Sequence, residues 1–141
     1  MSILSSLFGD PTIKVLHRYQ KDLLKIKKIE EDYRKTIDTI EAVQNKTQEF
    51  RDRFTPIRLR YITEQDSIDN NTSLSLEEKT ERVKKNHKNY ISEREEMVQS
   101  LRFEAIALHR RACEIIFGQE FILPSGNTKI WNMIPFDVQI L

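Results

Sequence analysis

The chain has 141 residues, of which 32% are charged, and it carries only three glycines and a formal net charge of +1. Scarce Gly and Pro with abundant Lys, Glu, Arg, Ile and Leu indicate long helices, and a hydrophobic fraction of 38% argues against a large globular core. Acidic and basic residues are interleaved, so the chain lacks the clustered basic face that nucleic-acid binding requires. We therefore expect no nucleic-acid partner.

The first predicted helix begins at Pro11, because Asp10 is a good N-cap and proline suits the first helical position. Two rows of mostly apolar residues then recur at heptad spacing: Leu16, Leu23, Glu30 and Ile37, and Tyr19, Ile26, Tyr33 and Ile40. Only Glu30 interrupts these rows. A stripe this narrow predicts a helix that packs along another helix.

A second predicted helix is shorter. Thr39 is a candidate cap for a helix from Glu41 to about Phe54, and Pro56 predicts a break or a kink. The polar segment 64–75 is rich in turn-forming residues and predicts a loop between two helical arms.

The third predicted helix runs from Leu76 to Phe117. Ser75 and Glu78 match a capping box at its start, and Gly118 is suited to end it. Its first half is nearly all charged, with sparse contacts at Val83, Tyr90 and Met97; its second half has a fuller stripe of Val98, Leu101, Ala105, Leu108, Ala112 and Ile115. This difference predicts a protruding first half and a second half docked on a core.

After Gly118 the sequence changes to strand signals. The segments "EFIL" and "TKIW" flank the turn "PSGN" and predict a β-hairpin. The alternation of Phe136, Val138 and Ile140 predicts a buried terminal strand. The predicted fold class is therefore mainly α: a long antiparallel helical hairpin or coiled-coil arm, with a short β-hairpin and a terminal strand near the C-terminus.

The residue chemistry does not make a complete enzyme. No Gly-Lys pair exists for a phosphate loop, and His17, His87 and His109 lack partners at metal-ligand spacing. The single cysteine, Cys113, lies in an apolar helical pattern and predicts a packed, inert thiol in a reducing, cytosolic compartment.

Met133, Phe136 and Gln139 are spaced three residues apart near the C-terminus. A glutamine amide offers the donor and acceptor that pair with adenine, and an aromatic ring or a thioether can stack on the base. The alternative is structural: Met133 and Phe136 belong to the core, and Gln139 points outward on a strand. Spacing alone favours this alternative.

Three motifs together resemble SecA, the motor ATPase of bacterial preprotein translocation. They are "LFGDP" at residues 7–11, "NKTQEFRDR" at residues 45–53 and "WNMIPFDVQIL" at residues 131–141. The second matches a K-T-x-E-F-[RK]-x-R pattern through Lys46, Thr47, Glu49, Phe50, Arg51 and Arg53, and "RFEAIALHRRACEIIFG" resembles the helix that follows. The charged insert at about 56–97 resembles a SecA subgroup with a long helical insertion.

The resemblance implies three parts: N-terminal helices at 1–55, a loop and charged helical insertion at 56–97, and a docking helix, β-hairpin and strand at 98–141. It assigns Met133, Phe136 and Gln139 to an adenine pocket and implies ATP as cofactor. The implied partners are a SecY-type channel, preproteins, an anionic membrane surface and a second protomer. The implied location is the cytoplasm, with a peripheral fraction on the inner face of the cell membrane.

The chain departs from the family pattern in two places. "TIEAV" at residues 39–43 stands where the family has S-D-E-E-L, and no G-x-G-K-T loop or Walker B carboxylate follows the "FDVQ" motif. We therefore expect a truncated SecA N-terminus that is inactive alone, since phosphoryl transfer needs those groups. The competing interpretation is a stand-alone helical interaction module that binds no nucleotide, and a weaker one places "ILSSLF" on an anionic membrane.

Overall fold

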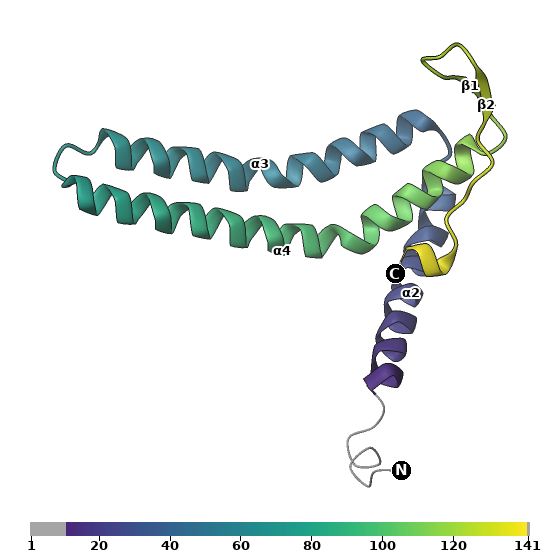
Figure 1. Ribbon diagram of the computed structural model, residues 1–141, viewed down its shortest axis with the longest axis horizontal. Helices are drawn as coiled ribbons and strands as arrows, with labels where there is room; N and C mark the ends of the chain where they lie inside the picture. Colours follow the sequence, from purple (N-terminus) through teal and green to yellow (C-terminus); the bar gives the residue numbers. More distant parts are fainter. Residues whose placement is uncertain (1–10, 141) are drawn as a thin grey trace, which may run out of the picture. The chain divides into compact units, whose positions relative to one another are not determined.

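The computed structural model describes residues 11–140 and is mainly helical, which confirms the predicted fold class (Figure 1). The helices are α2 (Pro11–Thr36), α3 (Ile40–Asn70) and α4 (Leu76–Ile116). Two short strands, β1 (Glu120–Ile122) and β2 (Thr128–Ile130), precede the 3₁₀ helix η1 (Asp137–Gln139).

The chain forms two compact units. The terminal unit comprises Met1–Val43 and Phe103–Leu141, and the hairpin unit comprises Gln44–Arg102. Each unit therefore contains one part of α4. The functional division at residues 55 and 97 stays a prediction.

The core of the terminal unit confirms the second half of the heptad pattern. Ile26 is 1% exposed, and Tyr33 and Ile37 are also buried on α2, as are Ala107, Leu108 and Cys113 on α4. Leu16, Tyr19 and Ile40 are exposed, so the narrow apolar stripe is buried only from about residue 26 to residue 37. The predicted cap Asp10 lies outside the described residues.

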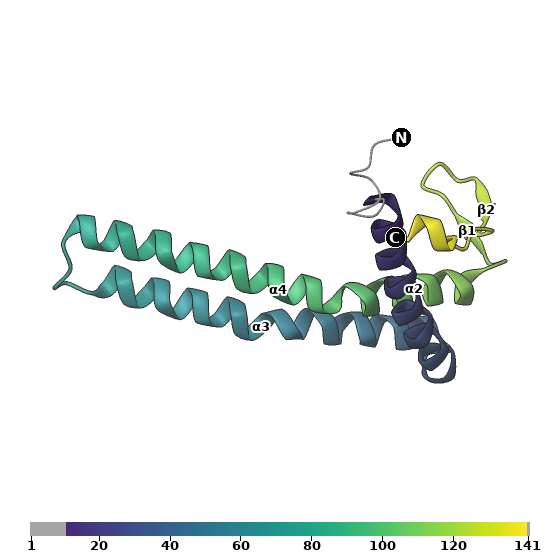
Figure 2. The same cartoon turned by 90° about the horizontal axis from the view of Figure 1, so that it is seen from below.

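In the hairpin unit, α3 and α4 run antiparallel and lie side by side (Figures 1 and 2). Ile57 and Ile68 of α3 are buried in this unit. The rings of Tyr61 and Tyr90 stack with centroids 4.5 Å apart, and Asn86 Nδ2 donates a hydrogen bond of 3.1 Å to the carbonyl oxygen of Tyr61. The predicted antiparallel helical hairpin is confirmed.

The predicted break at Pro56 and the predicted extent of the following loop are wrong. Helix α3 continues through Pro56 and ends only at Asn70, so the loop before α4 is shorter than the predicted 64–75. Proline has no backbone N–H, so the carbonyl oxygen of Asp52, four residues earlier, has no helical hydrogen-bond donor. Because Pro56 is exposed, water can bind that oxygen instead. The apolar spacing of Ile57, Tyr61 and Ile68 keeps one side of the helix in contact with α4, and this packing outweighs the local turn propensity.

The predicted caps that lie within the described residues are confirmed. The amide of Ala42 donates to Thr39 Oγ1, and the amide of Glu78 donates to Ser75 Oγ while Glu78 Oε2 accepts from the amide of Ser75. Gly118, with φ of 80°, follows the end of α4, and this left-handed conformation favours glycine. The predicted β-hairpin is also confirmed, with Glu120 opposite Ile130 in an antiparallel register.

The predicted terminal strand is wrong. Asp137–Gln139 form a 3₁₀ turn, and Phe136 and Val138 are 72% and 84% exposed instead of buried. An isolated strand leaves its backbone groups without partners, whereas the turn joins the amide of Gln139 to the carbonyl oxygen of Phe136 at 2.9 Å. The alternation of apolar residues therefore predicted the wrong element.

Candidate functional site

The candidate site is the C-terminal segment 131–140, which carries the three predicted adenine-binding residues. Trp131 Nε1 donates a hydrogen bond of 2.6 Å to the carbonyl oxygen of Met133. The side chains of Met133 and Phe136 are 54% and 72% exposed, and Gln139 is also exposed. The core role considered for Met133 and Phe136 is therefore wrong in this structure.

The side chain of Gln139 is held by the backbone of its own turn. The amide of Phe136 donates a hydrogen bond of 2.8 Å to Gln139 Oε1. This contact sets which end of the amide carries the oxygen, and it leaves one Oε1 lone pair and the Nε2 donors for another partner. The structure joins Phe136 and Gln139 in this way, while Met133 lies on the extended segment before them.

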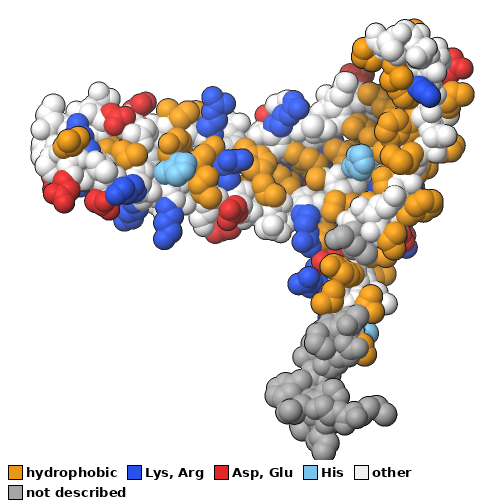
Figure 3. Space-filling view, viewed as in Figure 1, with side chains coloured by type: hydrophobic (Ala, Val, Ile, Leu, Met, Phe, Trp, Pro, Cys, Tyr) orange, Lys and Arg blue, Asp and Glu red, His pale blue; other side chains and the backbone are white. Residues whose placement is uncertain are grey.

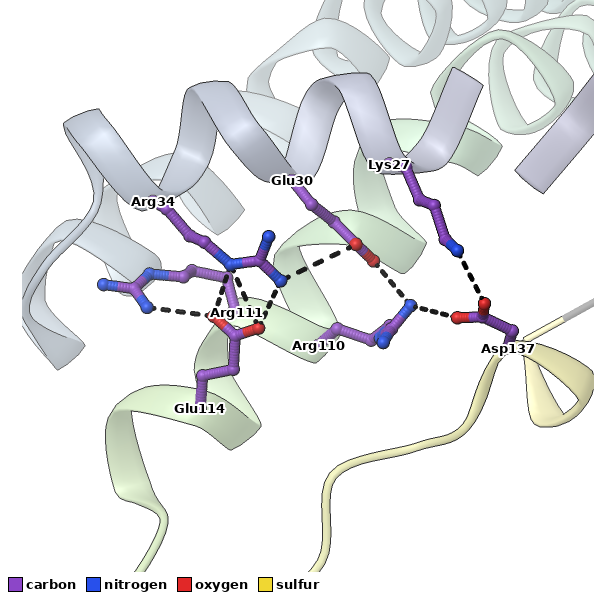
Figure 4. A network of polar contacts seen from close by, with 7 residues as sticks. All are labelled: Lys27, Glu30, Arg34, Arg110, Arg111, Glu114 and Asp137. Atoms are coloured by element: carbon purple, nitrogen blue, oxygen red, sulfur yellow. Dashed lines mark hydrogen bonds and ion pairs between the residues drawn. The ribbon is translucent and has the colours of Figure 1, made fainter. Parts of the chain in front are cut away.

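Asp137 ties this segment to the helices of the terminal unit. Its carboxylate lies 2.8 Å from Lys27 Nζ of α2 and 2.9 Å from Arg110 Nη1 of α4 (Figure 4). Because Lys27 and then Arg110 stabilise the ionised form, the pKa of Asp137 is lowered from its ordinary value. The segment is thus held by charge at Asp137, while its neighbours Phe136 and Val138 stay exposed.

Arg110 also reaches a buried carboxylate. Its Nη1 lies 3.0 Å from Glu30 Oε1, and Glu30 is only 4% exposed. Burial raises the pKa of Glu30, although Arg110 and Arg34 act in the opposite direction. Arg110 is therefore shared between a buried carboxylate on α2 and the partly exposed carboxylate of Asp137.

A second ion-pair group lies next to this one at the end of α2 (Figure 4). Arg34 binds Glu114 with Nη2 to Oε1 at 2.6 Å, and Arg111 Nη1 lies 3.0 Å from Glu114 Oε2. The hydrogen bond from Arg34 is the main reason that the pKa of Glu114 is lowered. Arg111 Nε also donates 2.7 Å to the carbonyl oxygen of Ile37, where α2 leaves carbonyls without helical partners.

Sequence reasoning missed this network, although one signal for it was visible. Glu30 was the single charge in the heptad rows, and a charge at a seam position requires a partner from a facing element. Arg110 and Arg34 are those partners. Asp137 carried no such local signal, because Lys27 and Arg110 are remote from it in sequence.

Cys113 is 2% exposed and burial raises the pKa of its thiol, as expected for a packed side chain. Within residues 11–140, no cluster of His, Cys, Asp and Glu is arranged to hold a metal ion. No helix in the described part of the chain combines the length and hydropathy needed to cross a membrane.

Attachment of the segment through Asp137 should depend on pH. Because the pKa of Asp137 is lowered in the folded chain, its stabilising contribution is complete above the ordinary pKa of about 3.9 and is lost as the pH falls through the folded pKa. An NMR titration should show the Asp137 carboxyl carbon titrating below that of an unstructured aspartate, with the amide of Val138 moving in parallel. An ordinary pKa for Asp137 would contradict the ion pairs.

A matched variant separates this contact from general acid effects. Asp137→Asn should remove the coupled movement of the Val138 amide. Asp38→Asn, at an exposed position between α2 and α3, should leave it intact.

Comparison with known proteins shows similarity to a translocase subunit. The whole chain aligns, over 148 positions at 27% identity, with the protein translocase subunit SecA of Chloroherpeton thalassium. The chain spans 14% of the length of that SecA. No family model matches the chain, and no solved structure matches it.

Proposed function

We propose that this chain is the N-terminal module of a SecA-like preprotein translocase motor, in which residues 131–140 supply part of an adenine site. One observation carries the proposal: the similarity to a SecA covers the whole chain, including the segment that Asp137 anchors and that leaves Gln139 exposed. The ATP phosphates would be bound by another part of the motor, since residues 1–141 contain no Gly-Lys pair.

The chemistry of the segment suits an adenine ring. Gln139 Nε2 can donate to a ring nitrogen, and the second lone pair of Oε1 can accept from the exocyclic amino group. The exposed ring of Phe136 and the thioether of Met133 supply apolar surface for stacking. The hydrogen bond from the Phe136 amide orients the Gln139 amide before any base arrives, which lowers the entropy cost of binding.

The proposal extends to the setting of such a motor. The partners are a SecY-type channel and preproteins, with action at the cytoplasmic side of the membrane and peripheral contact with an anionic lipid surface. The chain alone contributes no catalysis. An adenine contact without phosphate contacts forfeits most of the charge-assisted hydrogen bonds that hold ATP.

Nucleotide titration of the isolated chain tests the adenine assignment. We expect ATP and adenosine to bind about equally weakly, with a Kd on the order of 1 mM, and to shift the side-chain amide signals of Gln139 and the methyl signal of Met133. ATP hydrolysis should be absent. Gln139→Ala should remove the binding, whereas Gln119→Ala, at another exposed glutamine of the terminal unit, should retain it.

Three results would overturn this assignment. They are turnover of ATP by the pure chain, a strong preference for ATP over adenosine, and binding that Gln139→Ala leaves unchanged.

A further inference from the structure

The hairpin unit separates its charges along its length. Residues 64–81, around the turn between α3 and α4, carry six Asp and Glu residues and one lysine. Residues 82–94 carry five Lys and Arg residues and one glutamate, and residues 51–60 carry four arginines and one aspartate. We call residues 64–81 the acidic tip, and residues 51–60 with 82–94 the basic belt. Figure 3 shows Lys and Arg along the middle of the hairpin and Asp and Glu nearer its turn.

The two halves of the basic belt lie against each other. Arg60 Nη2 is 2.9 Å from Glu93 Oε2, and the rings of Tyr61 and Tyr90 stack next to this pair. The antiparallel pairing therefore places two basic stretches, separate in sequence, at the same level of the hairpin. Neither stretch alone is long enough to stand out in the sequence.

One side of the basic belt is an open groove of about 620 Å³. Its lining includes Arg51 and Arg58 of α3 and Arg94 of α4, and none of these three forms an ion pair with another described residue of the range 11–140. Arg94 lies over the ring of Tyr90, 5.6 Å from its centroid. The lining acid, Asp52, accepts a hydrogen bond from Gln48. The groove thus presents three guanidinium groups without an ion-pair partner among the described residues, together with one carboxylate.

A second groove of the belt differs in its charge balance. It contains Arg60, Arg82 and Lys85 but also Glu64 and Glu93, and Glu93 pairs with Arg60. The cationic excess is therefore larger in the groove that carries Arg51, Arg58 and Arg94, whose only acidic lining residue is Asp52.

The acidic tip offers the complementary chemistry. Asp66 and Glu77 are exposed and form no ion pair with the other residues that the structure describes. Between the acidic positions of the two helices, Leu76 is 83% exposed. The groove on the basic belt contains Phe54 and Val98, so it has an apolar surface for such a side chain as well as the arginines.

We propose that the acidic tip of one hairpin docks on the basic groove of a second copy of this chain. The centre of the tip and the centre of each half of the belt are about 16 residues apart along the chain, or roughly 24 Å at the rise of a helix. An antiparallel two-fold arrangement then places each tip on the other copy's belt at the same time, as an isologous interface requires. A second copy uses both charged regions, whereas an anionic membrane or an acidic protein would use the belt and be repelled by the tip.

Sedimentation velocity of the full chain tests the proposal. We expect a monomer–dimer equilibrium whose Kd weakens by roughly tenfold or more between low and high salt, because exposed charges are screened within a Debye length. A monomer at every salt and protein concentration would overturn it. So would a dimer that is insensitive to salt.

Charge reversal identifies the two surfaces. The belt variant Arg51→Glu, Arg58→Glu, Arg94→Glu and the tip variant Asp66→Lys, Asp69→Lys, Glu81→Lys should each be monomeric. An equimolar mixture should form a heterodimer, because each tip then meets a groove of opposite charge on the other variant. Formation of the heterodimer on mixing also shows that both variants are folded. The two lysines that the tip variant places near the C-terminal end of α3 interact favourably with the helix dipole.

A control and a second probe complete the test. Lys21→Glu, Lys28→Glu, Lys129→Glu makes the same charge change at exposed positions of the terminal unit and should leave the dimer intact. Vesicles of anionic phospholipid distinguish the other occupant. If the wild type stays monomeric but binds vesicles through the belt arginines, a lipid surface occupies the groove and the proposal is wrong. The inference does not rest on nucleotide binding, so either can fail without the other.

Discussion

Replacing Arg110 with methionine should destabilise the terminal unit by about 3–5 kcal/mol. Methionine keeps much of the side-chain volume but removes the cation, which leaves the almost fully buried Glu30 with only Arg34, 3.8 Å away, as an ion-pair partner. Asp137 loses one of its two ion-pair partners as well and keeps only Lys27. Urea denaturation followed by circular dichroism measures the loss in the free energy of unfolding.

The double variant Glu30→Met, Arg110→Met is the matched control. Removing both members of a buried ion pair leaves no unpaired charge, and apolar replacements of similar volume are often neutral. We expect the double variant to be clearly more stable than the single one, with a coupling of roughly 2 kcal/mol or more. A single variant as stable as the double would show that Glu30 does not depend on Arg110.

Replacing Ile26 with alanine should cost about 2–4 kcal/mol. Ile26 is 1% exposed on α2, so the truncation removes buried methyl groups and leaves a cavity that the surrounding helices fill only in part. The same denaturation experiment measures this loss.

Leu24 gives the matched control for Ile26. It lies two residues away on the same helix but is 68% exposed. Leu24→Ala should change stability by less than about 0.5 kcal/mol. Equal losses at the two positions would mean that α2 buries a different face.

The main helices and their caps were predictable from local chemistry. Ser75 and Glu78 are close in sequence and make their reciprocal hydrogen bonds whatever surrounds them. The break predicted at Pro56 does not occur. Pro56 is exposed, so water can bind the carbonyl oxygen that proline leaves without an amide partner, while Ile57 and Tyr61 pack toward α4. Helix ends set by packing over many residues cannot be found from one proline or from a few turn-forming residues.

The candidate site was predictable only in part. The resemblance to SecA assigned Gln139, and its exposure agrees with a binding role, but its hydrogen bond to the Phe136 amide depends on a turn that the apolar alternation did not predict. The anchor of the segment joins Asp137 to Lys27 and Arg110, which are far apart in the chain. Such contacts require the tertiary structure, although Glu30 in the heptad rows signalled that a partner was needed.

ATP hydrolysis by a chimera tests the proposed function most directly. In this chimera, the present chain replaces the corresponding segment of a SecA motor that retains its own phosphate loop. We expect the chimera to hydrolyse ATP, and Gln139→Ala to raise its KM for ATP roughly tenfold, since one lost base contact is worth about 1.4 kcal/mol, whereas Gln119→Ala has no effect. A folded chimera that does not hydrolyse ATP, or one in which Gln139→Ala changes nothing, would contradict the proposed function.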